Sequence, residues 1–196
     1  RAAEKLGLDI LGYRKVPVRP DGIGESALSV EPEIEQVFIA CPYQISDQET
    51  FERKLFVLRN YVSKTVRNTV PKEKALFYIA SLSSKTIVYK GQLTTYQVRD
   101  YYPDLSDEKM VSAFALIHSR FATNTFPSWR LAHPYRYIAH NGEINTLKGN
   151  LNWLRAGERD FATKYFSKEE MDMLLPIVEE GQSDSASLDN VIELLT

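Results

Sequence analysis

The pattern of hydrophobic and polar positions along the chain predicts both helices and strands. The best-defined helix follows Ser46–Glu49, where Ser46 and Glu49 fit a capping box at a helix start. Behind this start, hydrophobic residues recur at helical spacing, namely Phe51, Leu55, Leu58, Val62 and Val66. The apolar run from Ser112 to His118 has the length of a strand and predicts one that is buried on both faces.

The remaining pattern divides the chain into shorter elements. Further strands are predicted over residues 13–18, 34–41, 75–82, 86–90 and 135–140, with the third and fourth forming a hairpin. Further helices are predicted up to residue 11, over 94–102, 143–156 and 185–195, and after a second capping box at 167–170. Because the strands occur in clusters and do not alternate strictly with helices, the pattern favours an α+β fold over a doubly wound parallel sheet.

Composition and charge exclude several classes of protein. The 196 residues carry 24 Lys and Arg against 26 Asp and Glu, without a long basic block, which argues against binding to nucleic acid or to an anionic membrane surface. No apolar run approaches the length that spans a bilayer. The single Cys41 excludes a disulfide framework and a cysteine-based zinc site.

Both ends have helical patterns and the first residue is not Met, so we expect an internal piece of a longer polypeptide.

Cys41 and the three histidines are candidates for chemistry. Cys41 follows an apolar strand and precedes a proline, which is typical of a buried structural thiol. It could instead act as a nucleophile, with His118, His133 or His140 as the base. The histidines lack the close helical spacing of a metal site, so we expect no bound metal. Trp129 and Trp153 are expected to be packing residues.

Two candidate substrate-binding residues follow the strand that is predicted to end at His118. Arg120 carries a planar guanidinium that can hold a carboxylate through two parallel hydrogen bonds. Thr123 can add a hydroxyl donor. Loops at strand ends commonly present functional side chains. Arg120 could equally pair with a structural Asp or Glu, and the residue types alone leave both interpretations open.

Two further clusters have a structural and a functional interpretation. Asn141-Gly142 is a common tight hairpin turn, although the residues after it have a helical pattern. Alternatively, the Asn141 side-chain amide and the Gly142 backbone N–H form an oxyanion hole, which stabilises the charge on a carbonyl under attack. Asp184 lies in Gly181–Ser185, which suits a helix N-cap. Its carboxylate could instead hold a substrate ammonium.

Taken together, these clusters belong to long, ungapped motifs. The motifs are His118–Pro127, Ala139–Thr146 and Gly149–Trp153, with shorter supporting stretches at Val88–Gly91, Tyr102–Leu105 and Gly181–Ser185. They resemble the N-terminal glutaminase domain of the glutamate synthase large subunit, a class II glutamine amidotransferase. The resemblance extends from about residue 11 to the end of the chain.

The resemblance implies an N-terminal-nucleophile hydrolase fold within the α+β class. This fold is a four-layer α/β/β/α sandwich with antiparallel sheets, expected to be incomplete here. Residues 1–196 would be part of one type-2 glutamine amidotransferase domain that lacks the N-terminal segment with the nucleophilic Cys. Cys41 does not match the N-terminal Cys-Gly motif of the family, and its amine lies in a peptide bond. The fragment alone is therefore expected to be inactive.

The resemblance also implies a role for each candidate residue. Arg120 would hold the α-carboxylate of L-glutamine, with Thr123 as a secondary contact, and Asp184 would hold the α-ammonium. Asn141 and Gly142 would form the oxyanion hole. A guanidinium, a carboxylate and donors at the reacting carbonyl together suit a zwitterionic amino acid. In the intact enzyme L-glutamine would be hydrolysed through a thioester on an N-terminal Cys, and the ammonia would reach 2-oxoglutarate for reductive glutamate synthesis.

Cofactors and partners are expected mostly outside these residues. The resemblance implies FMN and an iron–sulfur cluster in the rest of the parent enzyme and no cofactor in this fragment. The expected partners are the synthase domains of the same polypeptide and, as electron donor, a small NAD(P)H-oxidising subunit or ferredoxin. The single cysteine and the reducing metabolism of the family favour the cytoplasm. Two other hypotheses stay open: a non-catalytic domain that binds an amino acid or mediates subunit contacts, and a thiol hydrolase that acts through Cys41.

Overall fold

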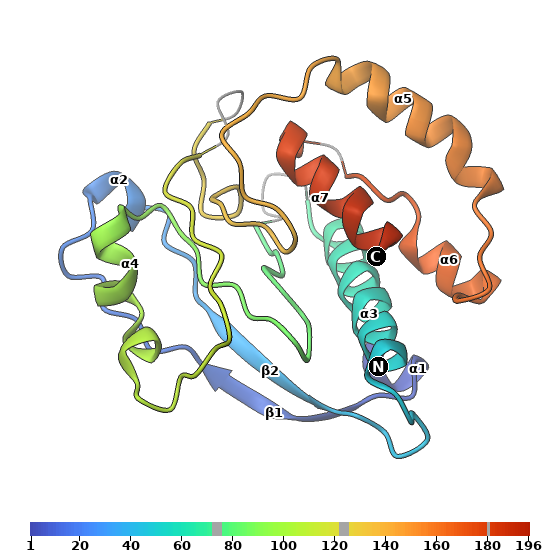
Figure 1. The fold of residues 1–196 in the computed structure, drawn as a ribbon, viewed down its shortest axis with the longest axis horizontal. Helices are drawn as coiled ribbons and strands as arrows, with labels where there is room; N and C mark the ends of the chain where they lie inside the picture. Colours follow the sequence, from blue (N-terminus) through green and yellow to red (C-terminus); the bar gives the residue numbers. More distant parts are fainter. Residues whose placement is uncertain (72–75, 122–125, 180) are drawn as a thin grey trace. The chain divides into compact units, whose positions relative to one another are not determined.

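The computed structural model describes residues 1–71, 76–121, 126–179 and 181–196. These residues form helices, short 3-10 turns and a two-stranded sheet, so the α+β class predicted from the sequence is confirmed for them (Figure 1). In chain order the elements are α1 (Ala2–Lys5), β1 (Asp9–Lys15), α2 (Glu25–Leu28), β2 (Glu35–Ala40), α3 (Gln48–Thr69), α4 (Thr95–Tyr101), η2 (Pro103–Ser106), α5 (Leu147–Gly157), η3 (Glu158–Asp160), α6 (Lys168–Leu174) and α7 (Asp184–Leu195).

The predicted helices with strong local start signals are confirmed. In α6 the capping box is present, since Ser167 accepts from the Glu170 N–H and the Glu170 carboxylate accepts from the Ser167 N–H. The helix α3 also forms, but the predicted capping box at Ser46 is wrong. Its N-cap is Asp47, whose Oδ1 accepts from the Thr50 N–H at 2.8 Å. Aspartate is as good an N-cap as serine, and the cap at Asp47 satisfies a free amide of the first turn one residue later than predicted.

The predicted helix at the beginning of the chain is too long. Its hydrogen bonds end at Gly7, which has φ of +69° and therefore a left-handed backbone that glycine adopts easily. The N–H groups of Gly7 and Leu8 donate to the carbonyls of Glu4 and Ala3, which is a Schellman arrangement at the end of α1. The chain then enters β1 at Asp9, earlier than the predicted strand start at residue 13.

The sheet consists of β1 and β2 in antiparallel register. The Val16 N–H donates to the Ile34 carbonyl at 2.9 Å, and the Arg14 guanidinium donates to the Gln36 side chain. Residue numbers therefore fall along β2 as they rise along β1. The position of β2 agrees with the strand predicted over residues 34–41.

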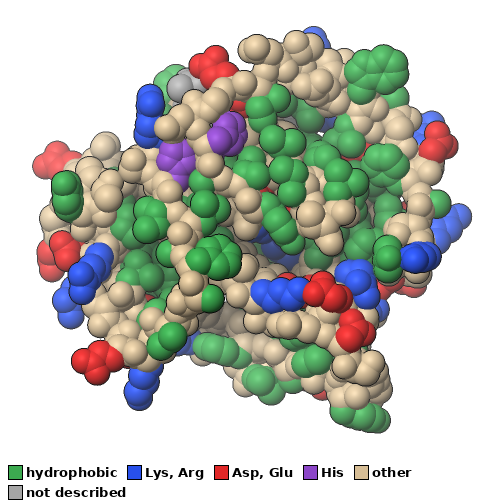
Figure 2. All heavy atoms as spheres, in the orientation of Figure 1, with side chains coloured by type: hydrophobic (Ala, Val, Ile, Leu, Met, Phe, Trp, Pro, Cys, Tyr) green, Lys and Arg blue, Asp and Glu red, His purple; other side chains and the backbone are tan. Residues whose placement is uncertain are grey.

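The other predicted strands are wrong for the described residues. Residues 76–82, 86–90, 112–118 and 135–140 form no strand, and residue 75 lies outside the described part of the chain. In the segment expected to be buried, Phe114 is 77% and Ile117 is 78% exposed. A strand that is buried on both faces needs hydrogen-bond partners at its edges and packing above and below, and the described residues form no sheet beside this segment. Hydrophobic side chains are visible at several places on the face of the molecule drawn in Figure 2.

The chain divides into two compact units, each built from three segments. The first comprises Arg1–Tyr13, Val37–Ile87 and Lys148–Val178; the second comprises Arg14–Gln36, Val88–Leu147 and Glu179–Thr196. In the first unit α3 and α6 lie side by side (Figure 1). Both helices bury apolar side chains, including Leu55 and Leu174, and Lys54 Nζ pairs with the Glu170 carboxylate at 2.6 Å.

The second unit has an aromatic core. The rings of Tyr101 and Tyr102 pack edge to face, and Tyr101 also contacts Trp129. Trp129 is 3% exposed and donates from Nε1 to the Ala27 carbonyl, so its predicted packing role is confirmed. The same prediction is wrong for Trp153 of the first unit, which is 82% exposed.

The helix predicted over residues 143–156 starts later than expected, as α5 at Leu147. Thr146 has φ of +60°, outside the range of a right-handed helix. The Ile144 N–H donates to the Asp184 carboxylate at 2.8 Å. Residues 143–146 thus form a loop that belongs to the second unit. Within the described residues, no helix has both the length and the apolar character needed to cross a membrane.

Candidate functional site

The segment before Asn141 is fixed by a buried carboxylate from α7. Asp189 is 0% exposed, and its Oδ1 accepts from the backbone N–H groups of Tyr137 at 2.8 Å and Ile138 at 3.2 Å. Its Oδ2 lies 3.0 Å from the guanidinium of Arg136. These backbone N–H groups therefore donate to a side chain and not to a neighbouring strand. This explains why residues 135–140 do not form the strand that their apolar pattern predicts.

The segment after Gly142 is fixed by the first residue of the same helix. Asp184 is 6% exposed; its Oδ2 accepts from the Ile144 N–H at 2.8 Å and its Oδ1 from the Ser185 N–H at 2.7 Å. The predicted capping role in this motif falls to Ser183, whose hydroxyl accepts from the Ala186 N–H. The loop that carries Asn141 and Gly142 is thus held on both sides by α7 (Figure 1).

A third contact joins this loop to the segment that contains Arg120. The Nε2 atom of His118 lies 2.8 Å from the His140 carbonyl oxygen. A carbonyl oxygen can only accept, so Nε2 carries the proton and donates. Arg120 lies two residues after His118, and Asn141 directly follows His140. Hydrogen bonds therefore bring the segments that contain Arg120, Asn141 and Asp184 together within the second unit.

The predicted site residues differ in burial. Arg120, Asn141 and Gly142 are exposed, so their donors can meet a ligand, whereas Asp184 is buried beneath the loop. Thr123 lies outside the described residues. The hairpin interpretation of Asn141-Gly142 is wrong, because the described segments on either side form no strand.

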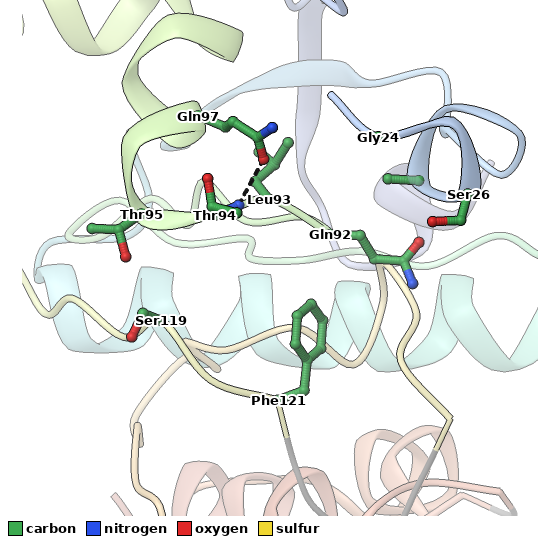
Figure 3. A pocket seen from close by; sticks show the side chains of 10 residues that line it. Gly24, Ser26, Gln92, Leu93, Thr94, Thr95, Gln97, Ser119 and Phe121 are labelled. Carbon is green, nitrogen blue, oxygen red and sulfur yellow. Dashed lines mark hydrogen bonds between the residues drawn. The ribbon is translucent and has the colours of Figure 1, made fainter. Parts of the chain in front are cut away.

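A pocket of about 520 Å³ in the second unit lies next to the Arg120 segment (Figure 3). Ser119 and Phe121, the neighbours of Arg120, line it, but none of the predicted site residues that the structure describes does. Its other lining residues among those described are uncharged, and the side chain of Gln97, one of them, accepts from the Thr94 N–H. The pocket thus offers neutral polar groups and an aromatic face, which differ from the charged groups predicted for a zwitterion.

A cluster of histidines, which the sequence analysis did not anticipate, lies beside the loop. The ring centre of His133 is 4.7 Å from that of His118, 4.6 Å from that of Tyr135 and 5.7 Å from that of His140. His133 is 5% exposed, and neither of its ring nitrogens has a hydrogen-bond partner among the described residues. Histidine side chains also gather at one place in Figure 2. Across the described residues, no group of three or more His, Cys, Asp or Glu is arranged to hold a metal ion.

Burial and nearby positive charge act together on His133. Burial, followed by the charges of His118, His140 and Lys90, lowers the pKa of His133 from 6.5 to about 4. Lys90 is itself 8% exposed and donates from Nζ to the Arg130 carbonyl at 2.7 Å. Burial lowers the pKa of Lys90 to about 7. The interior beside the loop therefore disfavours additional positive charge.

Acid should destabilise the protein through His133. Between pH 6.5 and about 4 the unfolded state binds a proton that the folded state does not, so stability falls as pH is lowered through this window. We expect His133→Phe, which keeps a ring against Tyr135, to reduce the pH dependence of the free energy of unfolding by up to about 1.4 kcal/mol per pH unit. Urea unfolding from pH 7.5 to 4 measures this. Above pH 7 both proteins should share the same slope, and an unchanged slope below pH 6.5 would contradict the prediction.

Asp189 and Lys90 were also missed by the sequence analysis. Asp189 contacts backbone groups 51 to 53 residues away, so no local pattern could identify it. The buried thiol predicted at Cys41 is wrong, because Cys41 is exposed. It follows β2 directly and lies in the first unit, where its Sγ is 3.9 Å from the Pro42 carbonyl oxygen.

The sequence matches known proteins over its whole length. Residues 1–196 match the family profile described as "Glutamine amidotransferases class-II". The chain is 52% identical over 190 residues to a protein named glutamate synthase (NADPH) large chain from Bacillus subtilis, which covers 97% of this chain and 12% of that protein. It is 52% identical over 200 residues to glutamate synthase (NADH) from Schizosaccharomyces pombe, covering 100% of this chain and 9% of the relative.

A third relative carries a different electron donor in its name. It is ferredoxin-dependent glutamate synthase 2 from Synechocystis, which is 41% identical over 188 residues, with 96% of this chain and 12% of the relative covered. The chain thus spans about a tenth of the length of the curated relatives it matches.

Proposed function

Because the chain belongs to the class-II glutamine amidotransferases, we propose that it is the glutaminase part of a glutamate synthase. In this proposal residues 1–196 form part of one amidotransferase domain with the four-layer α/β/β/α fold of N-terminal-nucleophile hydrolases. The nucleophilic Cys lies outside these residues. The observation that carries the proposal is the 2.8 Å hydrogen bond between the Ile144 N–H and Asp184 Oδ2, which joins the Asn141–Gly142 loop to the Gly181–Ser185 stretch.

The proposed reaction uses the exposed donors of this loop. A thiolate attacks the side-chain amide carbon of L-glutamine, and the carbonyl oxygen becomes an oxyanion. Asn141 and Gly142 donate to that oxygen through the side-chain amide and the backbone N–H. The intermediate collapses to a γ-glutamyl thioester as the nitrogen takes up a proton and leaves as ammonia. Water then hydrolyses the thioester, which releases glutamate and restores the thiol.

Opposite charges on the protein would orient the glutamine. Arg120 is exposed and can hold the α-carboxylate through two parallel hydrogen bonds. Asp184 supplies the negative charge that binds the α-ammonium, and Thr123 is a secondary contact of the substrate. Fixing both ends of the amino acid places its amide carbon at the loop and removes the entropic cost of positioning from the chemical step.

The rest of the polypeptide would complete the reaction. Ammonia would pass to the synthase domains, add to 2-oxoglutarate, and give a second glutamate after a two-electron reduction. FMN and an iron–sulfur cluster are assigned to those domains and would carry the electrons. NADPH, NADH and ferredoxin appear in the names of relatives, and the electron donor of this protein would be one of them. We place the protein in the cytoplasm.

A glutamine analogue that alkylates thiols tests the proposal. With the full-length polypeptide, 6-diazo-5-oxo-L-norleucine should label one Cys outside residues 1–196 and abolish glutamine-dependent synthesis, while synthesis from added ammonia continues. Peptide mass spectrometry locates the label. Cys41→Ser is the matched control and should react in the same way as the parent protein.

Two results would reject the proposal in different ways. Labelling of Cys41 with loss of activity would support a thiol hydrolase that acts through Cys41. Absence of both labelling and glutamine turnover would support a non-catalytic domain that binds an amino acid or mediates subunit contacts.

A further inference from the structure

The loop that carries the proposed oxyanion donors has no regular structure of its own. Residues 136–144 form neither helix nor strand. The backbone N–H groups of Tyr137 and Ile138 donate to Asp189, and the His140 carbonyl accepts from His118. Side chains from distant parts of the sequence thus satisfy the backbone groups that a helix or strand would otherwise satisfy.

Oxyanion donors work only when their position is fixed. Catalytic groups have to be held within about 0.5 Å of the productive geometry. A loop without a hydrogen-bonded ladder does not provide such precision by itself. The backbone on the N-terminal side of Asn141 therefore needs an external support, and Asp189 and His118 form hydrogen bonds with it.

We propose that Asp189 and His118 are positioning residues that hold the Asn141–Gly142 donors in place for glutamine hydrolysis. The inference rests on the proposed glutaminase function and adds two residues to it. Asp189 holds the loop two to four residues before His140, and His118 holds His140 itself. Asp189 is 0% exposed, so it acts through the loop and does not touch the substrate.

The charge of Asp189 suits this role. Its two oxygens accept from three successive backbone N–H groups, at residues 136, 137 and 138, and one of them also pairs with the Arg136 guanidinium. An ionised carboxylate forms stronger hydrogen bonds with N–H donors than a neutral amide does. Asparagine has one acceptor oxygen and places two donors where these N–H groups lie, so Asp189→Asn should release part of the loop while keeping side-chain volume.

A double-mutant cycle in the full-length protein tests the proposal. Asp189→Asn should lower kcat for glutamine hydrolysis by about 10- to 100-fold, as expected for misplaced catalytic groups. The KM for glutamine should change by less than about threefold, and synthesis from added ammonia should be unchanged. In the Asn141→Ala background the same substitution should lower kcat by a smaller factor than in the parent protein, because one of the two donors that it positions is already gone.

Glu193→Gln is the matched control on the same helix. Glu193 Oε2 accepts from Arg136 Nε at 2.8 Å, next to the contact that Asp189 makes. The substitution changes one partner of Arg136. It leaves the hydrogen bonds of Asp189 with the N–H groups of Tyr137 and Ile138 in place. Glu193→Gln should therefore keep kcat within about twofold of the parent protein.

A second pair of variants keeps the test decisive if Asp189→Asn fails to fold. His118→Phe removes the donor to the His140 carbonyl and should lower kcat by about 10- to 100-fold. His118→Gln carries an amide N–H at a similar distance from the backbone and should restore most of the lost kcat. Equal activity of the Phe and Gln variants would overturn the role of His118.

The cycle separates failure of this inference from failure of the proposed function. A full, independent loss from Asp189→Asn in the Asn141→Ala background would overturn the positioning role alone. An equal loss of the ammonia-dependent activity would do the same, since it would indicate general damage. If Asn141→Ala itself left glutamine hydrolysis unchanged, the oxyanion assignment would fail, and this inference with it.

Discussion

Replacing Asn141 with Ala should lower glutamine-dependent glutamate synthesis by the full-length protein by about 10²- to 10³-fold, the loss typical for an oxyanion donor. The substitution removes the side-chain N–H that would donate to the developing oxyanion and leaves the Gly142 N–H as the remaining donor. Asn141 is exposed, so the free energy of unfolding should stay within about 0.5 kcal/mol of the parent value. The loss should appear in kcat, because the charge on the oxygen develops only in the transition state.

Synthesis from added ammonia is the internal control for Asn141→Ala. It bypasses glutamine hydrolysis and should be retained. Asn152→Ala is a matched control, since Asn152 is an exposed asparagine on α5 that the proposal does not use. Steady-state rates with glutamine and with ammonium chloride give both values. Equal loss of the two activities would reject the oxyanion role of Asn141.

The helices of this chain could be predicted because their signals are local. The capping box of α6, the Pro103 that follows α4 and the apolar periodicity of α3 each lie within a few residues of the helix they define. Where the prediction was off by a residue, as at Asp47, an equivalent cap stood next to the predicted one. Local chemistry therefore fixed these elements independently of the rest of the fold.

Strands could not be predicted in the same way, because their stability comes from partners distant in sequence. The apolar run at residues 112–118 has the pattern of a buried strand, yet it is exposed where no described strand pairs with it. Residues 135–140 have a strand pattern as well, but their N–H groups donate to Asp189, more than 50 residues away. A sequence pattern indicates what a segment can pair with and not whether the partner is present.

The residues of the candidate site could be predicted from the sequence, but the contacts between them could not. Arg120, Asn141 and Asp184 could be selected from residue type and motif alone. The contacts that join their segments could not, because His118 reaches His140 and Asp184 reaches Ile144 across 22 and 40 residues. His133 carried no sequence signal beyond its residue type, and its burial against two other histidines depends on the fold.

Asp184→Asn should raise the KM for glutamine by about 10- to 100-fold, which corresponds to loss of a charged hydrogen bond of about 1.5–3 kcal/mol. In the proposal Asp184 binds the α-ammonium of glutamine. Its oxygens also accept from the N–H groups of Ile144 and Ser185. A carboxylate oxygen has two lone pairs, so one group can serve both partners. The neutral amide keeps one acceptor oxygen for the loop but loses the charge that attracts the ammonium.

An analogue without the ammonium separates these two roles of Asp184. Glutaramate has the carboxylate and amide of glutamine but no amino group, so its inhibition constant reports every contact except the one with the ammonium. If Asp184 binds the ammonium, Asp184→Asn should weaken glutamine and leave glutaramate within about threefold. If Asp184 only anchors the loop at Ile144, both ligands should weaken together and kcat should fall as in Asn141→Ala. The ratio of the two affinities therefore tests the buried carboxylate as a recognition group independently of its hydrogen bond to the loop.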